Sequence, residues 1–399
     1  MSADDIKTAI SKFIDLHKSE IIDFSDYLGT HPELSSEEFE SSRLCVEKLT
    51  SHGFEVEYPF LGLPTAFMAK KRAANAASDA PKIAIMVEYD ALPEIGHACG
   101  HNLHGTMALY AGIALAEQAD KINAEIWVVG TPAEETDGGK VLMADEGVFD
   151  NVDFAIMFHS YGGASFTDYR ALAIDGYDFT YKGQTSHAAA TPWRGRSAQN
   201  GVMLFIDAIN MMRLHIKDGW RIHALITHVS GATNIIPDKA VCRVEARAPQ
   251  RAELDSLMET VFCCAKGAAI ATGTEFEAHK FMRSFDDMLP NLAAEALARE
   301  TLESMGVKCT YGPGPNGSTD VGNVSYRCPA IQPEFAITSQ NLDLHTREFT
   351  AATMSEEGHE ALIKGAKAIS AICLRFATEE DTRKKIKNEF YERKNAANS

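Results

Sequence analysis

The chain has 399 residues, of which 45% are hydrophobic and 24% are charged, which is typical of a globular protein with room for two domains. Its net charge of −18 disfavours binding to nucleic acids and anionic membranes, and no basic patch overrides this charge. No run approaches the roughly 20 apolar residues of a membrane span, and the amino-terminal residues lack a signal-peptide core. These features predict a cytoplasmic protein without nucleic-acid or membrane partners.

The eight cysteines are scattered and include no C-x-x-C pair. This spacing argues against a disulfide framework and is typical of small buried apolar side chains. Cys99 is an exception because it lies among histidines.

The first half of the sequence predicts alternating helices and strands. Helical periodicity covers the first 30 residues, and Ser35 with Glu38 is interpreted as a capping box that opens a second helix, which Gly53 can close. Strands are predicted at 54–59, 65–70, 82–88, 124–130 and 153–158, with helices near 103–118 and 138–146. The last three strands are almost continuously apolar, which favours an α/β fold whose mainly parallel sheet is covered on both faces.

From Ala173 onward the pattern changes to strand, helix, strand, strand, helix, strand, at 173–182, 196–217, 222–230, 239–247, 251–271 and 274–282. This order is typical of a ferredoxin-like α+β domain. A helix at 291–305, a strand near 331–337 and a helix from 355 to 377 then resume the first pattern. We therefore predict a discontinuous three-layer catalytic domain, residues 1–172 and 286–399, with an inserted domain at 173–285.

Polar clusters follow three consecutive predicted strands. Glu88-Tyr89-Asp90 and the segment 97–104 follow the first, Glu134-Glu135 follows the second, and His159 follows the third directly. Because functional groups of open α/β sheets gather beyond the carboxyl ends of the strands, these clusters predict one site.

The residue types in these clusters favour a transition-metal site. Three histidines and Cys99 lie within the eight residues of segment 97–104, and carboxylates are nearby. This mixture suits zinc, manganese or cobalt better than magnesium or calcium, and a thiolate can bridge two cations. Paired metals polarise a carbonyl and activate a bridging water, which still needs a base. Of the adjacent Glu134 and Glu135, one can bind metal while the other accepts the proton.

One further motif is interpreted as a loop. Gly312-Pro313-Gly314-Pro315-Asn316-Gly317 satisfies G-x-G-x-x-G, but its two prolines and the lack of a following helical pattern argue against dinucleotide binding. The sequence also contains no P-loop and no G-x-S-x-G elbow.

Several motifs together resemble the dimetal aminoacylase and carboxypeptidase family. They are Glu88-Tyr89-Asp90-Ala91-Leu92-Pro93, His97-Ala98-Cys99-Gly100-His101-Asn102, Pro132-Ala133-Glu134-Glu135 and Leu344-His345. The resemblance covers nearly the whole chain and is strongest to the amidohydrolase subfamily, in its aminobenzoyl-glutamate hydrolase and β-alanyl dipeptidase branch.

The resemblance implies roles for individual residues. It implies Cys99 as a bridging metal ligand, Glu134 as general base and Asp90 as a carboxylate that orients a ligand. The remaining metal ligands that it implies are His101, Glu135, His159 and His345. In the inserted domain, which resembles the family's dimerisation domain, it implies substrate contacts by His187, Asn234 and Arg247, with His187 reaching the active site of a neighbouring protomer.

The sequence therefore predicts a homodimeric amidohydrolase with two divalent ions per chain, zinc or manganese. Its substrates would be small N-acyl amino acids or dipeptides, attacked by a metal-bridging water. One alternative is a cysteine hydrolase with Cys99 as nucleophile and His101 or His159 as base, which the nearby carboxylates disfavour. Another is a non-catalytic binding protein that retains the fold, which the complete ligand set argues against.

Overall fold

The computed structural model describes residues 2–73, 76–77 and 79–397. The chain divides into two compact units, each with its own hydrophobic core. The larger unit comprises Met1–Arg170, Met288–Gly314 and Asp320–Ser399, and the smaller unit comprises Ala171–Asp287 and Pro315–Thr319. The smaller unit is thus inserted into the sequence of the larger one.

A six-stranded sheet in the order β1-β2-β4-β3-β5-β11 forms the centre of the larger unit. Strands β4, β3, β5 and β11 are parallel, whereas β1 and β2 join as antiparallel neighbours. The strands are β1 (Glu55–Glu57), β2 (Phe67–Arg72), β3 (Lys82–Val87), β4 (Glu125–Gly130), β5 (Phe154–Ile156) and β11 (Ala330–Ile331). The mainly parallel sheet confirms the predicted α/β fold.

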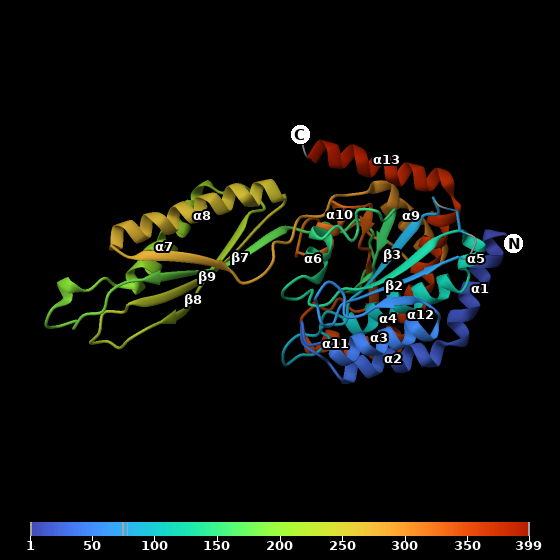
Figure 1. Ribbon diagram of the computed structural model, residues 1–399, viewed down its shortest axis with the longest axis horizontal. Helices are drawn as coiled ribbons and strands as arrows, with labels where there is room; N and C mark the ends of the chain where they lie inside the picture. The colour runs from blue at the N-terminus through green and yellow to red at the C-terminus, as the bar shows by residue number, and fades with distance from the viewer. Residues whose placement is uncertain (1, 74–75, 78, 398–399) are drawn as a thin grey trace. The chain divides into compact units, whose positions relative to one another are not determined.

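Both faces of this sheet are buried. Ile83 and Ile85 of β3 belong to the main core cluster, while Ala84 and Met86 on the opposite face are also inaccessible to solvent. Helix α4 (His101–Ala116) is buried along its whole length and packs against both β3 and α12 (Glu356–Thr378), as Figure 1 shows. The apolar runs of the sequence are explained by this double cover.

The remaining helices of the larger unit surround this core. They are α1 (Ala3–Leu16), α2 (Lys18–Thr30), α3 (Phe39–Ser51), α5 (Ala119–Ile122), α6 (Gly139–Asp145), α9 (Leu292–Ser304), α10 (Val321–Ser325), α11 (Arg347–Thr353) and α13 (Glu380–Ala397). Among the described residues, no helix is both long enough and apolar enough to cross a membrane.

Two predicted strands are divided in the structure. The run at 153–158 yields β5 and then β6 (His159–Gly162), and the run at 331–337 yields β11 and then β12 (Glu334–Thr338). Strands β6 and β12 leave the main sheet and form a separate parallel pair, in which Glu334 lies opposite His159. Hydrophobic periodicity does not reveal such a break, because both halves of each run are buried.

The predicted capping box at Ser35 and Glu38 is wrong. Helix α3 begins at Phe39, and Glu38 occupies its N-cap position without a side-chain hydrogen bond to the helix. The Ser35 hydroxyl donates instead to Asp90, and Glu38 accepts hydrogen bonds from residues outside the helix. Tertiary contacts have taken both side chains away from the local motif.

The smaller unit has the predicted ferredoxin-like order. Its antiparallel sheet runs β10-β7-β9-β8, and helices α7 and α8 cover one face of it (Figure 1). The elements are β7 (Ala173–Lys182), η1 (Pro192–Arg194), α7 (Ala198–Met212), η2 (Arg213–His215), β8 (Arg221–Val229), β9 (Lys239–Ala248), α8 (Arg251–Thr272) and β10 (Glu275–Lys280). The core between helices and sheet contains Phe179, Tyr181 and Phe205.

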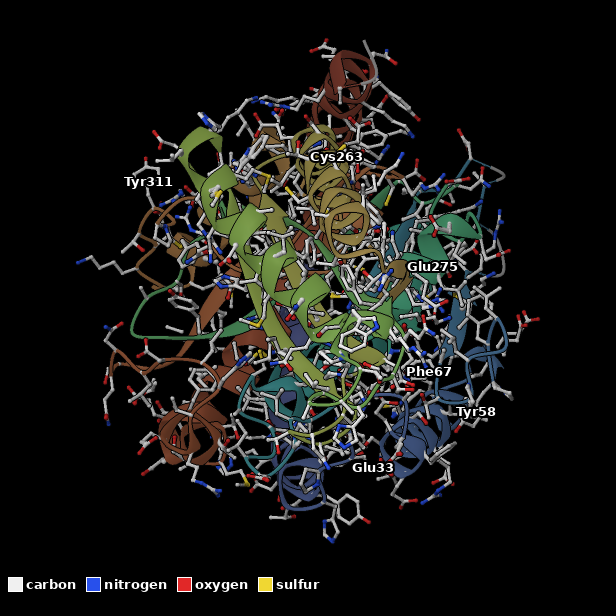
Figure 2. All side chains as sticks on the ribbon, turned by 90° about the vertical axis from the view of Figure 1, so that its left-hand side faces the viewer. Glu33, Tyr58, Phe67, Cys263, Glu275 and Tyr311 are labelled. Atoms are coloured by element: carbon white, nitrogen blue, oxygen red, sulfur yellow. The ribbon has the colours of Figure 1, made fainter. Side chains whose placement is uncertain are left out.

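The segment 312–317 contains neither helix nor strand, so its interpretation as a loop is correct. Tyr311, which precedes this segment, is 81% exposed and lies at the margin of the view in Figure 2.

Candidate active site

Cys99 and His101 lie where the loop after β3 turns into α4. Gly100 between them has a φ of 80°, a left-handed conformation that favours glycine. A Cβ atom at Gly100 would lie only 2.6 Å from the Cβ atom of Ser160. Glycine therefore lets the thiol and the imidazole flank a tight helix start.

The structure brings five predicted metal ligands together in the larger unit. The Sγ atom of Cys99 lies 3.4 Å from Nε2 of His159 and 3.6 Å from Nε2 of His345. The Oε1 atom of Glu135 lies 3.6 Å from Nε2 of His345 and 3.9 Å from Nε2 of His101. The donor atoms form two groups, Cys99–His101–His159 and Cys99–Glu135–His345, each within 4.8 Å. Both groups share the thiol of Cys99.

Carboxylates orient two of the imidazoles. Nδ1 of His101 lies 3.0 Å from Asp90, and Nδ1 of His159 lies 3.1 Å from Glu334. A carboxylate that accepts the Nδ1 proton leaves the Nε2 lone pair free to bind a metal. Among the described residues, the buried His101 Nε2 and Glu135 Oε1 atoms have no hydrogen-bond partner. Buried polar atoms without partners are rare, so this donor set fits divalent cations.

Asp90 links two parts of the cluster. One of its oxygens faces His101, and the other accepts hydrogen bonds from the backbone N–H of Glu135 at 3.1 Å and from the Ser35 hydroxyl at 2.7 Å. The same carboxylate thus orients an imidazole and fixes the loop that carries the glutamate pair.

Glu134 lies in a second, fully buried group of charges. Its carboxylate gathers with those of Glu88 and Asp320, with one oxygen from each within 4.8 Å of the others. The ammonium of Lys140 lies 2.6 Å from Glu88 and 2.7 Å from Asp320. Burial, reinforced by Glu88, Glu135 and Asp320, raises the pKa of Glu134 well above its usual value. Glu134 is therefore in a setting where a carboxylate can hold a proton.

The electrostatics also bear on Cys99. Burial raises the pKa of its thiol well above the usual value, and the charges of Glu135 and Glu134 add to this effect. A thiol in such a setting is a poor nucleophile. A bound cation reverses this situation because it stabilises the thiolate. The surroundings of Cys99 therefore favour a metal ligand over a free nucleophile.

His345 approaches the cluster from a strained loop. Its φ is 61°, which is unusual for a residue other than glycine, and its backbone N–H donates to the carbonyl of Ala98 at 2.9 Å. Its side chain is 54% exposed, unlike those of the other members of the cluster. Backbone strain of this kind concentrates at functional sites.

His104 supports the second charge group from behind. The backbone N–H of Ser160 donates to its Nδ1 atom at 3.1 Å, so Nε2 carries the proton and faces Glu88 at 2.9 Å. Burial lowers the pKa of His104 to about 3, which keeps the ring neutral. His104 therefore orients Glu88.

The three residues expected to contact substrate belong to the smaller unit. His187 and Asn234 are neighbours there, because the N–H of Ala188 donates to the carbonyl of Asn234 at 3.0 Å. The backbone N–H groups of Ala189 and Ala190 donate to Nδ1 of His187, so its exposed Nε2 carries the proton. Arg247 on β9 lies apart from this pair, and its guanidinium donates to the Ser318 hydroxyl at 3.2 Å.

The sequence analysis missed Glu334, Lys140 and Glu38 as members of the site's framework. Glu334 lies 175 positions from His159 in the sequence, so only the strand pairing joins them. Lys140 follows Gly138-Gly139 in a segment whose pattern resembles an exposed helix start. Its position shortly after the glutamate pair is the one signal that could have suggested a role.

Comparisons with known proteins place this geometry in a family. Residues 84–375 match the model of peptidase family M20/M25/M40. The Xaa-Arg dipeptidase of Mus musculus is 33% identical over an alignment that covers 86% of this chain and 84% of the mouse protein. One of the two kinds of chain in the p-aminobenzoyl-glutamate hydrolase of Escherichia coli strain K12 is 28% identical, with 91% of this chain and 90% of that protein covered.

Solved structures show the same fold. An aminobenzoyl-glutamate utilization protein from Klebsiella pneumoniae superposes with a TM-score of 0.72 at 17% identity, covering 93% of this chain and 99% of that one. A dinuclear metal binding peptidase from Bacillus subtilis superposes with a TM-score of 0.66 at 20% identity, covering 90% and 99%.

Proposed function

Since this chain belongs to peptidase family M20/M25/M40, and is therefore a hydrolase of amide or peptide bonds, we propose that it cleaves dipeptides and small N-acyl amino acids with two divalent ions, zinc or manganese. The observation that carries the proposal is the pair of donor groups that share Cys99. The relatives are named for a dipeptide and for p-aminobenzoyl-glutamate, so a small amide is common to both.

The proposed ligand set follows from the donor groups. Cys99 bridges the two ions, and the remaining ligands are His101, Glu135, His159 and His345. Asp90 and Glu334 support this assignment because they hold two imidazoles with Nε2 directed at the cluster. The mixture of thiolate, imidazole and carboxylate suits zinc and manganese equally.

Glu134 is the proposed general base. Two divalent ions bound at this cluster would polarise the substrate carbonyl and lower the pKa of the attacking water. Glu134 accepts the proton of that water and returns it to the leaving nitrogen, for which its buried, proton-retaining setting is suited. Lys140 keeps the neighbouring carboxylates of Glu88 and Asp320 paired meanwhile.

The smaller unit is the proposed dimerisation and lid domain. Strand β8 is the edge of its sheet and exposes Leu225, Ile226 and Val229, and helix α7 exposes Met203 and Met211. An exposed apolar sheet edge favours pairing with a second copy. In such a C2 dimer, His187 donates its Nε2 proton to the developing oxyanion in the other protomer's site, with Asn234 and Arg247 contacting substrate.

We also propose a cytoplasmic location. All eight cysteines are free, including Cys45, Cys328 and Cys373, whose thiols are buried. Free thiols in this number suit a reducing compartment. Microscopy of the tagged full-length chain tests this placement.

The decisive test combines a substrate panel with metal analysis. Purified protein is assayed on Xaa-Arg dipeptides, p-aminobenzoyl-glutamate and N-acetyl amino acids, before and after chelation. We expect cleavage of at least one class and two bound ions per chain. Full activity without metal would favour Cys99 as a nucleophile. Bound metal without cleavage of any class would favour a non-catalytic binding protein.

A further inference from the structure

Two glutamates at the start of α3 have different tasks. Glu33, labelled in Figure 2, accepts hydrogen bonds from the backbone N–H groups of Glu40 at 2.9 Å and Ser41 at 2.7 Å, and so caps the helix. Glu38 occupies the N-cap position itself, yet its side chain turns away from the helix and is completely buried. A carboxylate is costly to bury unless hydrogen bonds compensate it, so its partners indicate its role.

The partners of Glu38 lead to the loop of the glutamate pair. Its Oε1 atom accepts the backbone N–H of Ala133 at 2.8 Å and that of Ser36 at 2.9 Å. Its Oε2 atom accepts the Thr65 hydroxyl at 2.8 Å. Ala133 directly precedes Glu134, 95 positions along the sequence from Glu38.

Ala133 has an unfavourable backbone conformation. Its φ is 60°, in the left-handed region that alanine seldom occupies, and it is 3% exposed. Its carbonyl accepts the N–H of Gly138 at 2.8 Å, which closes the loop on the other side. A strained residue persists only where its surroundings hold it, and the bond to Glu38 is such a restraint.

We propose that Glu38 is a positioning residue for the catalytic loop, which holds Ala133 in its left-handed conformation and thereby aims Glu134. The inference rests on the proposed roles of Glu134 and Glu135. Asp90 restrains the same loop at its other end through the N–H of Glu135, so the two glutamates lie between two carboxylate restraints. Removal of one restraint misdirects the base while leaving the metal ligands in place.

The test exploits the strain at Ala133. In Glu38→Ala, we expect kcat to fall roughly tenfold or more, with KM and bound metal little changed, because small misplacements of a reacting group cost rate. Adding Ala133→Gly should restore at least about fivefold of kcat, because glycine adopts positive φ without strain. Burial raises the pKa of Glu38 to about 7, so Glu38→Gln resembles the protonated form and should retain most activity.

Glu33→Ala is the matched control. It removes the cap of α3, so the thermal midpoint should fall while kcat is retained, and Ala133→Gly should not reverse that loss. A double variant of Glu38→Ala and Ala133→Gly that is no faster than Glu38→Ala alone would overturn the proposal. If Glu38→Ala does not fold, the same comparison is made with Glu38→Asp, whose shorter carboxylate cannot keep both sets of partners.

Hydrogen exchange separates this inference from the proposed function. Glu38→Ala should accelerate amide exchange in residues 131–136, and Ala133→Gly should slow it again, whether or not the chain cleaves any tested substrate. Unchanged exchange in this loop refutes the positioning role. Faster exchange in a chain that hydrolyses no amide would refute the proposed function alone.

Discussion

The two units hold their candidate functional residues in opposite ways. In the larger unit, Cys99 is 7% exposed and His101 is fully buried, and each imidazole of the buried cluster has a carboxylate or backbone partner. In the smaller unit, His187 and Asn234 are exposed, and only the Nδ1 side of the His187 ring is held. The larger unit is preorganised for metal chemistry, whereas the smaller unit presents contacts for something that comes to it.

This contrast implies separate failures. Damage to the buried cluster should abolish chemistry without affecting the assembly of the smaller unit. Damage to the exposed surface should leave metal binding intact and reduce the rate. The following experiments test this separation in order of decreasing effect.

Metal removal should have the largest effect. Exhaustive chelation is expected to abolish hydrolysis, because Cys99 and its four partner ligands have no other shared role. The oligomeric state should persist, because the core of the smaller unit contains none of these residues. Activity after dialysis with zinc or manganese, metal content and light scattering are the measurements. Loss of the dimer on chelation would contradict the separation.

The two adjacent glutamates should respond differently. Glu134→Gln keeps the shape of the side chain but cannot accept a proton, so kcat should fall by roughly 10²–10⁴-fold with metal content unchanged. Glu135→Gln should instead lower metal occupancy at limiting metal. Each variant is the control for the other. Equal metal loss in both would show that the division between base and ligand is wrong.

His187→Ala tests the exposed surface. The rate should fall by about 10²–10³-fold while both metals remain bound, because a donor to the oxyanion is lost. Mixing this variant with Glu134→Gln should restore part of the activity, since a hybrid dimer contains one site with both residues. If protomers exchange and activity does not return, His187 acts within its own chain or has no catalytic part.

Leu225→Lys should have the smallest effect. A charge on the exposed edge of β8 is expected to weaken dimerisation by about 10–100-fold, which lowers activity only in dilute solution. Ile270→Lys is the control, because Ile270 is 73% exposed but lies on α8 rather than on the edge strand. Sedimentation across a concentration series measures both. Equal weakening by the two variants would argue against β8 as the interface.

The sequence predicted the fold where local pattern decides it. Strand β7 was predicted at 173–182 and is found at Ala173–Lys182, and β3 differs from its predicted range by one residue. Buried apolar runs and alternation carry this information directly. The capping box failed because Ser35 and Glu38 bind Asp90 and Ala133, which are distant in the sequence.

The candidate site was predictable to the same limit. Cys99 and His101 belong to one short motif, and Glu134 and Glu135 to another, so local patterns were enough to find them. Glu334 and Lys140 were not found, because their roles arise from strand register and from packing between α6 and the start of α10. Residue chemistry is local, whereas the restraints that orient it are tertiary.

The pairing of His159 with Glu334 across β6 and β12 has a consequence for synthesis on the ribosome. Cys99, His101 and Glu135 emerge early, but the partner carboxylate at 334 and the ligand at 345 follow only after the entire smaller unit has been translated. A nascent chain therefore carries an unfinished half-site with an accessible thiol for most of its synthesis. Metal loading becomes a late step in biogenesis, and a truncated chain that ends before β12 should not retain the ions of the complete protein.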